Sequence, residues 1–129
     1  GILAEEMSYR AGGLAIINPL FTPALMLNVR PLTLTSAVEN VENLGRVLVE
    51  QSPLRADDTL LIHSVSGRNA ITIDVALAAK ACGAKVIAIT SLATAARVSY
   101  RQQPGITYLR NHVGKCAHAA YSRQRIHRR

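Results

Sequence analysis

The chain has 129 residues, of which 49% are hydrophobic and 18% are charged, and this is enough for one domain with a single core. The formal net charge of +7 comes from one end: residues 1–96 carry seven basic and eight acidic residues, whereas 97–129 carry eight basic residues and no acid. No run of about 18 apolar residues occurs, and Glu5 and Glu6 interrupt the apolar start. These features exclude a membrane span and a signal peptide, and they predict a cytoplasmic protein.

The first half of the chain predicts a loop followed by one helix. Two prolines in Asn18–Pro23 indicate a surface loop. Ser36 and Glu39 have the spacing of a capping box, and apolar residues then recur at helical spacing through Leu48. We therefore expect a helix from about residue 37 to 51.

Residues 58–92 predict a strand, a loop, a helix and a second strand. The apolar run Leu60–Ile62 does not alternate with polar residues, which is typical of a strand covered on both faces in a parallel sheet. Helical spacing begins at Asn69, and Gly83 stands where the helix would end. Val86–Thr90 is the second apolar strand. The chain is therefore predicted to be an α/β domain with parallel strands.

The loop between this first strand and the helix has the composition of an anion-binding site. It lies where open α/β sheets bind ligands, at the carboxyl end of a strand and the start of a helix. Gly67 permits a tight turn, and hydroxyl and amide side chains supply neutral donors. The predicted phosphate-binding residues are Ser64, Ser66, Gly67, Arg68, Asn69 and, after the second strand, Ser91. In the alternative, Ser66 or Asn69 only caps the helix and Arg68 is an exposed side chain.

Cysteine and histidine do not form a metal site in this sequence. Cys82 and Cys116 are far apart and lack a CxxC pair, so we expect free thiols. His112, Cys116 and His118 match no complete zinc-ligand pattern. We therefore predict neither a metal nor another cofactor.

The segments SVSGRN, GAKVIAITSL and AEEMSYRAGGLAIINPL together resemble the SIS (sugar isomerase) domain family. The resemblance covers roughly residues 2–93. It is strongest to the small bacterial stand-alone SIS proteins of poorly defined activity, and the phosphoheptose isomerases are more distant. The resemblance implies a three-layer α/β/α fold with a parallel, doubly wound, flavodoxin-like sheet. It also implies binding of a phosphorylated sugar and assembly into a homodimer or tetramer, with Asn18–Pro23 near the subunit contact.

Both ends of the chain depart from the family pattern. A SIS domain would have an earlier helix and a first strand, so we expect this chain to lack them. We expect a partial SIS domain over 1–96 and a divergent basic tail over 97–129, disordered apart from a weak strand at Gly105–Leu109.

Glu6 is the candidate catalytic residue, because a carboxylate can move the proton in aldose–ketose isomerisation. The resemblance aligns Glu6 with the second glutamate of the corresponding segment in phosphoheptose isomerases. Ile2 stands one turn earlier, where those enzymes have histidine, so a metal-assisted mechanism is not predicted. In the alternative, Glu6 belongs to an exposed first helical turn. His63 is either a second acid–base candidate or a buried or interface side chain.

Three functions remain open from the sequence. The leading one is binding of a phosphorylated sugar, with or without isomerisation. The second is a non-catalytic phosphosugar sensor that acts through a subunit interface. The third is nucleic-acid binding by the basic tail, which we do not expect because aromatic residues there are sparse and a solvated tail explains the charge.

Overall fold

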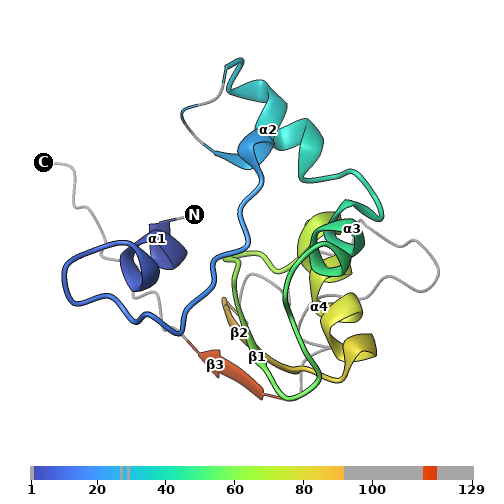
Figure 1. Ribbon diagram of the computed structural model, residues 1–129. Helices are drawn as coiled ribbons and strands as arrows, with labels where there is room; N and C mark the ends of the chain where they lie inside the picture. The colour runs from blue at the N-terminus through green and yellow to red at the C-terminus, as the bar shows by residue number, and fades with distance from the viewer. Residues whose placement is uncertain (1, 27, 29, 92–114, 119–129) are drawn as a thin grey trace, which may run out of the picture.

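A three-stranded parallel sheet forms the centre of the molecule. The computed structural model describes residues 2–26, 28, 30–91 and 115–118. The strands are β1 (Thr59–His63), β2 (Lys85–Thr90) and β3 (Lys115–His118), and they lie in the order β1-β2-β3. Figure 1 shows the sheet with helices on two sides of it. The predicted α/β class with a parallel sheet is confirmed.

The β1–α4–β2 unit follows the sequence prediction closely. Helix α4 (Ala70–Cys82) connects β1 to β2, and the register pairs Thr59 with Lys85. The helix ends at Gly83, whose φ of 91° lies in the left-handed region that glycine adopts without steric cost. The N–H of Gly83 donates to the Lys80 carbonyl. The chain therefore leaves the helix directly into β2.

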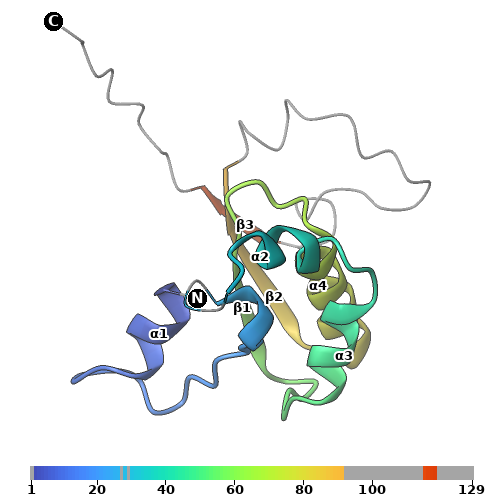
Figure 2. The same ribbon diagram turned by 90° about the horizontal axis from the view of Figure 1, so that it is seen from above.

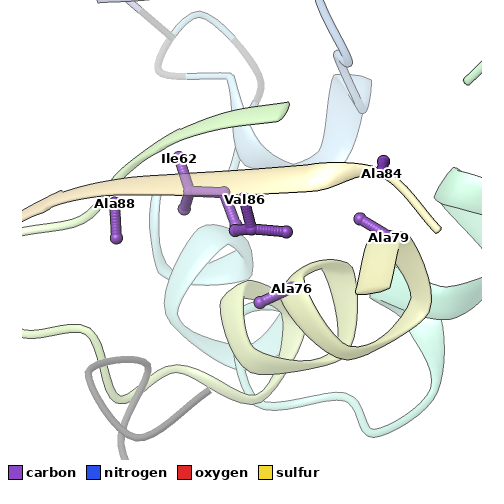
Figure 3. Close-up of a cluster of buried hydrophobic side chains, with 6 residues drawn as sticks. All are labelled: Ile62, Ala76, Ala79, Ala84, Val86 and Ala88. Carbon is purple, nitrogen blue, oxygen red and sulfur yellow. The ribbon is translucent and has the colours of Figure 1, made fainter. Parts of the chain in front are cut away.

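The core lies between α4 and one face of β1 and β2. Figure 3 shows its six buried side chains, which come from the helix, the two strands and the connection between them. Four of them are alanines, and Ala76, Ala79 and Ala88 are completely buried. Because these side chains are small, the helix packs close to the sheet. The members of the cluster are Ile62, Ala76, Ala79, Ala84, Val86 and Ala88.

The opposite face of the sheet is more open than the sequence predicted. Burial alternates along both strands, and Leu61 and Ile87 remain 38% and 36% exposed. Helix α1 (Ile2–Ser8) lies on this side, away from α3 and α4, in both views (Figures 1 and 2). In the described part of the chain, α1 does not cover these strands, so β1 and β2 are fully packed on one face only.

The predicted helix over 37–51 is wrong, because two short helices occupy this region. They are α2 (Thr33–Val38) and α3 (Leu44–Glu50), and a 3-10 turn, η1 (Pro23–Leu25), precedes them. Ser36 lies inside α2, so it does not cap a helix. Asn43 has a left-handed φ of 66°, which breaks the helical path before α3. The break allows α3 to pack against α4.

Strand β3 differs from the coil that the sequence predicted after Leu109. It pairs in parallel with β2, joining Ile87 to Lys115 and Thr90 to His118. Backbone hydrogen bonding to the available edge of β2 outweighs the weak strand propensity of this segment. The predicted strand at Gly105–Leu109 and the rest of the predicted tail lie outside the described residues. Among the described helices, none is long and apolar enough to cross a membrane.

Candidate functional site

The loop that follows β1 is fixed to the end of β2 by three hydrogen bonds. The Ser64 N–H donates to the Ile89 carbonyl over 3.1 Å, which continues the strand ladder by one residue. The Ser91 N–H and the Thr90 hydroxyl then donate to the Val65 carbonyl, over 3.0 and 3.2 Å. Thr90 is 3% exposed, so this anchor is buried. The structure therefore brings Ser91 beside the Ser64–Asn69 loop.

Gly67 forms the tight turn inside the loop. Its φ is 61°, and its N–H donates to the Ser64 hydroxyl oxygen over 3.2 Å. A side chain at this position would be strained. Ser64 thus closes the turn, and its hydroxyl hydrogen remains a donor. Ser66 and Arg68 flank Gly67 and are both partly exposed.

Asn69 begins α4 but does not cap it with its side chain. Its backbone is extended, with φ −68° and ψ 139°, and its side-chain amide donates to the Glu39 carboxylate instead. The alternative prediction that the Asn69 side chain only caps the helix is therefore wrong. Within the described residues, no hydrogen bond occupies the N–H groups of Ser66, Asn69 and Ala70. These donors lie at the positive end of the α4 dipole, where anions bind favourably.

Glu6 lies on α1, and the structure does not join it to the serine loop. Its carboxylate forms an ion pair with Arg10, one turn further along the chain. The side chains of Glu6 and Arg10 are 55% and 64% exposed, so this pair is a surface feature of small energetic weight. Glu5 is also exposed.

A groove of about 860 Å³ runs along β1, and its lining comes from α1, the segment after α1, both faces of β1 and the first half of α4. The sequence did not predict it, because it depends on how α1 sits relative to the strands. His63 lines this groove with an exposed side chain, so it is not the buried residue of the sequence alternative. Much of the other lining is apolar and includes Leu3, Met7, Leu61 and Ile87, while Asp57 and Asp58 add two carboxylates.

Asp74 is a second carboxylate that the sequence did not single out. It lies on α4, near the backbone N–H groups of Asn43 and Gly45 at the start of α3. Burial raises the pKa of Asp74, and these backbone groups oppose the rise. Its Oδ2 atom is buried without a partner among the described residues. Asp74 therefore lies at the contact between α4 and the start of α3.

Histidine, cysteine and carboxylate side chains do not gather in the described residues: no group of three could hold a metal ion there. His112 and the side chains of Cys116 and His118 lie outside the described part of the structure. Cys82 is a free thiol on the surface.

A parallel α/β sheet with a hydroxyl-rich loop and a helix start at its carboxyl edge defines a class of small-anion-binding domains. The sequence profile of the SIS domain matches residues 1–91, which is most of the chain. The chain therefore belongs to the SIS domain family, and the resemblance found in the sequence is confirmed.

Several bacterial UPF0309 proteins are similar to this chain. A UPF0309 protein of Shouchella clausii is 52% identical over 105 residues, which cover 81% of this chain and 43% of the relative. A UPF0309 protein of Streptomyces coelicolor is 44% identical over 112 residues, covering 86% and 44%. A third, from Geobacillus thermodenitrificans, is 46% identical over 91 residues, covering 70% and 36%. The chain thus spans less than half the length of these relatives.

Proposed function

We propose that this domain binds a phosphorylated sugar, with the phosphate at the Ser64–Asn69 loop and Ser91. One observation carries the proposal: the loop that leads from β1 into α4 is hydrogen-bonded to the end of β2. Ser64 and Ser91 are held together by backbone hydrogen bonds of 3.1 and 3.0 Å through Ile89 and Val65. Membership of the SIS domain family supports the sugar phosphate as the class of ligand.

The available donors suit a phosphate group. Hydroxyls at Ser64 and Ser66 and open N–H groups at Ser66, Asn69 and Ala70 would supply neutral hydrogen bonds to phosphate oxygens. The dipole of α4, a helix of 13 residues, adds a favourable potential for negative charge. Binding of this kind needs no metal ion.

Isomerisation of the bound sugar is the finer part of the proposal. It assigns proton transfer to Glu6, the carboxylate on α1. Glu6 is paired with Arg10 and faces solvent, so turnover requires the bound sugar to extend from the loop toward α1. His63, which precedes the loop, and Met7, which follows Glu6, both line the groove beside β1.

The proposal is tested by thermal melting with and without a panel of hexose, heptose and amino-sugar phosphates. A ligand that binds only the folded state stabilises it by about 2.7 kcal/mol at a concentration of 100 times its Kd, so one or more phosphosugars should raise the melting temperature. The parent sugars without phosphate should not. A cooperative melt that no phosphosugar shifts would refute the proposed function.

A matched pair of serine variants locates the binding site. Ser66→Ala removes a loop hydroxyl and should weaken phosphosugar binding by about 1–3 kcal/mol. Ser36→Ala removes an exposed hydroxyl on α2 and should leave the ligand-induced shift unchanged. Equal shifts in both variants would place the ligand elsewhere.

A further inference from the structure

Glu39 joins the α2–α3 segment to the start of α4 through two contacts. Its Oε2 atom accepts a hydrogen bond from Asn69 Nδ2 over 2.9 Å, and its main-chain carbonyl accepts one from the Ile71 N–H over 3.3 Å. Glu39 is the residue at which α2 ends, and it is partly buried. A residue 30 positions away in the chain therefore touches the rim of the serine loop.

The carboxylate fixes one side-chain amide at the proposed phosphate site. An asparagine amide has two N–H donors, and the bond to Glu39 uses one of them. The second donor of Asn69 is then held in one orientation. A donor that is already ordered loses less entropy when a ligand binds.

Glu39 itself is poorly suited to contact a phosphate. An ionised carboxylate is an acceptor only, and two negative groups at close range repel each other. Its partner, the Asn69 amide, is neutral and can present a hydrogen-bond donor to the ligand. In this arrangement the Glu39 carboxylate orients the Asn69 amide, and the neutral amide contacts the ligand.

We propose that Glu39 is a positioning residue of the phosphosugar site, which acts through the Asn69 side chain. This inference rests on the proposed function and adds a residue outside the serine loop to it. It makes the end of α2 part of the site. It also predicts that the hydrogen bond, and not the negative charge, is what the site requires.

The test compares Glu39→Ala, which removes the acceptor, with Glu39→Gln, which keeps an amide oxygen as acceptor without the charge. Glu42→Ala is the control, because Glu42 is exposed in the same connection between α2 and α3 and its loss changes the charge equally. The probes are inorganic phosphate and the phosphosugar that shifts the wild-type melt. Glu39→Ala should weaken binding by about three- to tenfold, the size of one net hydrogen bond, while the other two variants bind as the wild type does.

A double-variant cycle separates positioning from a general loss of structure. Because Glu39 acts through Asn69, adding Glu39→Ala to Asn69→Ala should weaken binding no further. Additive losses would overturn the inference, and so would Glu39→Gln binding as weakly as Glu39→Ala. If the wild type binds a probe and Glu39→Ala binds it with the same affinity, the positioning role is overturned. The proposed function would then still stand. If the wild type binds neither probe, the proposed function fails and the positioning role fails with it.

Discussion

Asp74 is a carboxylate with a structural task at the interface of two helices. Its carboxylate lies near the first N–H groups of α3, whose own helix provides no partners for them. Burial penalises the ionised form, and the nearby Glu42 adds to this effect, while the backbone N–H groups and Arg46 oppose it. The net result is a pKa raised from the ordinary value of 3.8.

The raised pKa predicts how stability depends on pH. A carboxyl that binds its proton more tightly in the folded state stabilises the fold when protonated. The contribution of Asp74 should be complete below its ordinary pKa of 3.8 and should be lost as the pH rises through the higher folded value. Asp74→Asn keeps an acceptor oxygen but cannot ionise. The unfolding free energy of Asp74→Asn minus that of the wild type should therefore increase from acidic to neutral pH.

Urea unfolding of both proteins across this range is the measurement. Asp57→Asn, at an exposed position before β1, is the matched control for removing one negative charge. A difference between Asp74→Asn and wild type that falls with rising pH would contradict the assigned direction.

Glu6 carries the catalytic part of the proposed function. Glu6→Gln preserves the shape of the side chain but removes the base, so any isomerisation should fall by at least about 100-fold, the usual contribution of general acid–base catalysis. Phosphosugar binding should remain close to that of the wild type, because the serine loop is untouched. Turnover assays and melting shifts on the same preparation measure the two effects. Retained turnover would remove Glu6 from the mechanism.

At the scale of elements, the contact between α3 and α4 depends on one glycine. A Cβ at Gly45 would lie 2.3 Å from the Ile71 carbonyl oxygen and 2.7 Å from Asp74 Cβ. Both neighbours belong to α4, and the nearest one is backbone, so neither can move cheaply. The two helices therefore approach as closely as they do because position 45 has no side chain.

Gly45→Ala tests this close packing, because the packing determines whether the substitution raises or lowers the free energy of unfolding. In an exposed helix the change stabilises by up to about 1 kcal/mol, because alanine favours the helix. Here the overpacked contact should destabilise the fold by about 1–3 kcal/mol. Arg46→Ala, at the exposed neighbouring position, should change stability by less than about 0.5 kcal/mol in the same denaturation experiment. A stabilised Gly45→Ala protein would be incompatible with the close packing.

The same region explains which elements the sequence could predict. The β1–α4–β2 unit was predictable because its signals are local: apolar runs for the strands, and Gly83 at the end of the helix. The helix over 37–51 was mispredicted because contacts from α4 decide that region. Glu39 accepts hydrogen bonds from Asn69 and Ile71, and Gly45 of α3 packs directly against α4. A capping-box pattern contains no information about such distant partners.

The candidate site divides in the same way. The position of the serine loop follows from the order of strand, loop and helix, so the sequence was sufficient to place it. The sequence indicated Glu39 only as part of a capping box. Its hydrogen bond to Asn69 spans 30 positions in the chain, so no local pattern could predict it. The groove beside α1 depends on the packing of segments that are far apart in the chain. Local patterns therefore located the loop but not its surroundings.

At the scale of the whole molecule, the two faces of the sheet differ in burial. Ile62 belongs to the core cluster with α4 and is 8% exposed, whereas its neighbour Leu61 lies on the opposite face of β1 and is 38% exposed. The uninterrupted apolar run at 60–62 concealed this difference, because a polar residue would normally mark the open face. The sequence therefore predicted the strand correctly, while among the described residues its second face is only partly covered.

Truncation of these two neighbours measures the difference. Ile62→Ala should cost about 2–5 kcal/mol, the usual range for a core aliphatic residue. Leu61→Ala removes a similar side chain and should cost clearly less, because much of that side chain already contacts water. Denaturant unfolding of the two variants under one condition gives the comparison. Equal losses would mean that something covers the groove side of the sheet in solution.

The parallel pairing of β1 with β2 also sets an order of events in folding. The paired residues are 26 positions apart, as for Thr59 and Lys85, so the strands can meet only after the chain has closed a loop of that size. Helix α4 relies on contacts within a few residues and can form earlier. The bonds of Ser64 and Ser91 to the opposite segment need the strands to be paired already. We therefore expect the serine loop to acquire its shape in the last step, so that only a fully folded chain would present the proposed phosphate site.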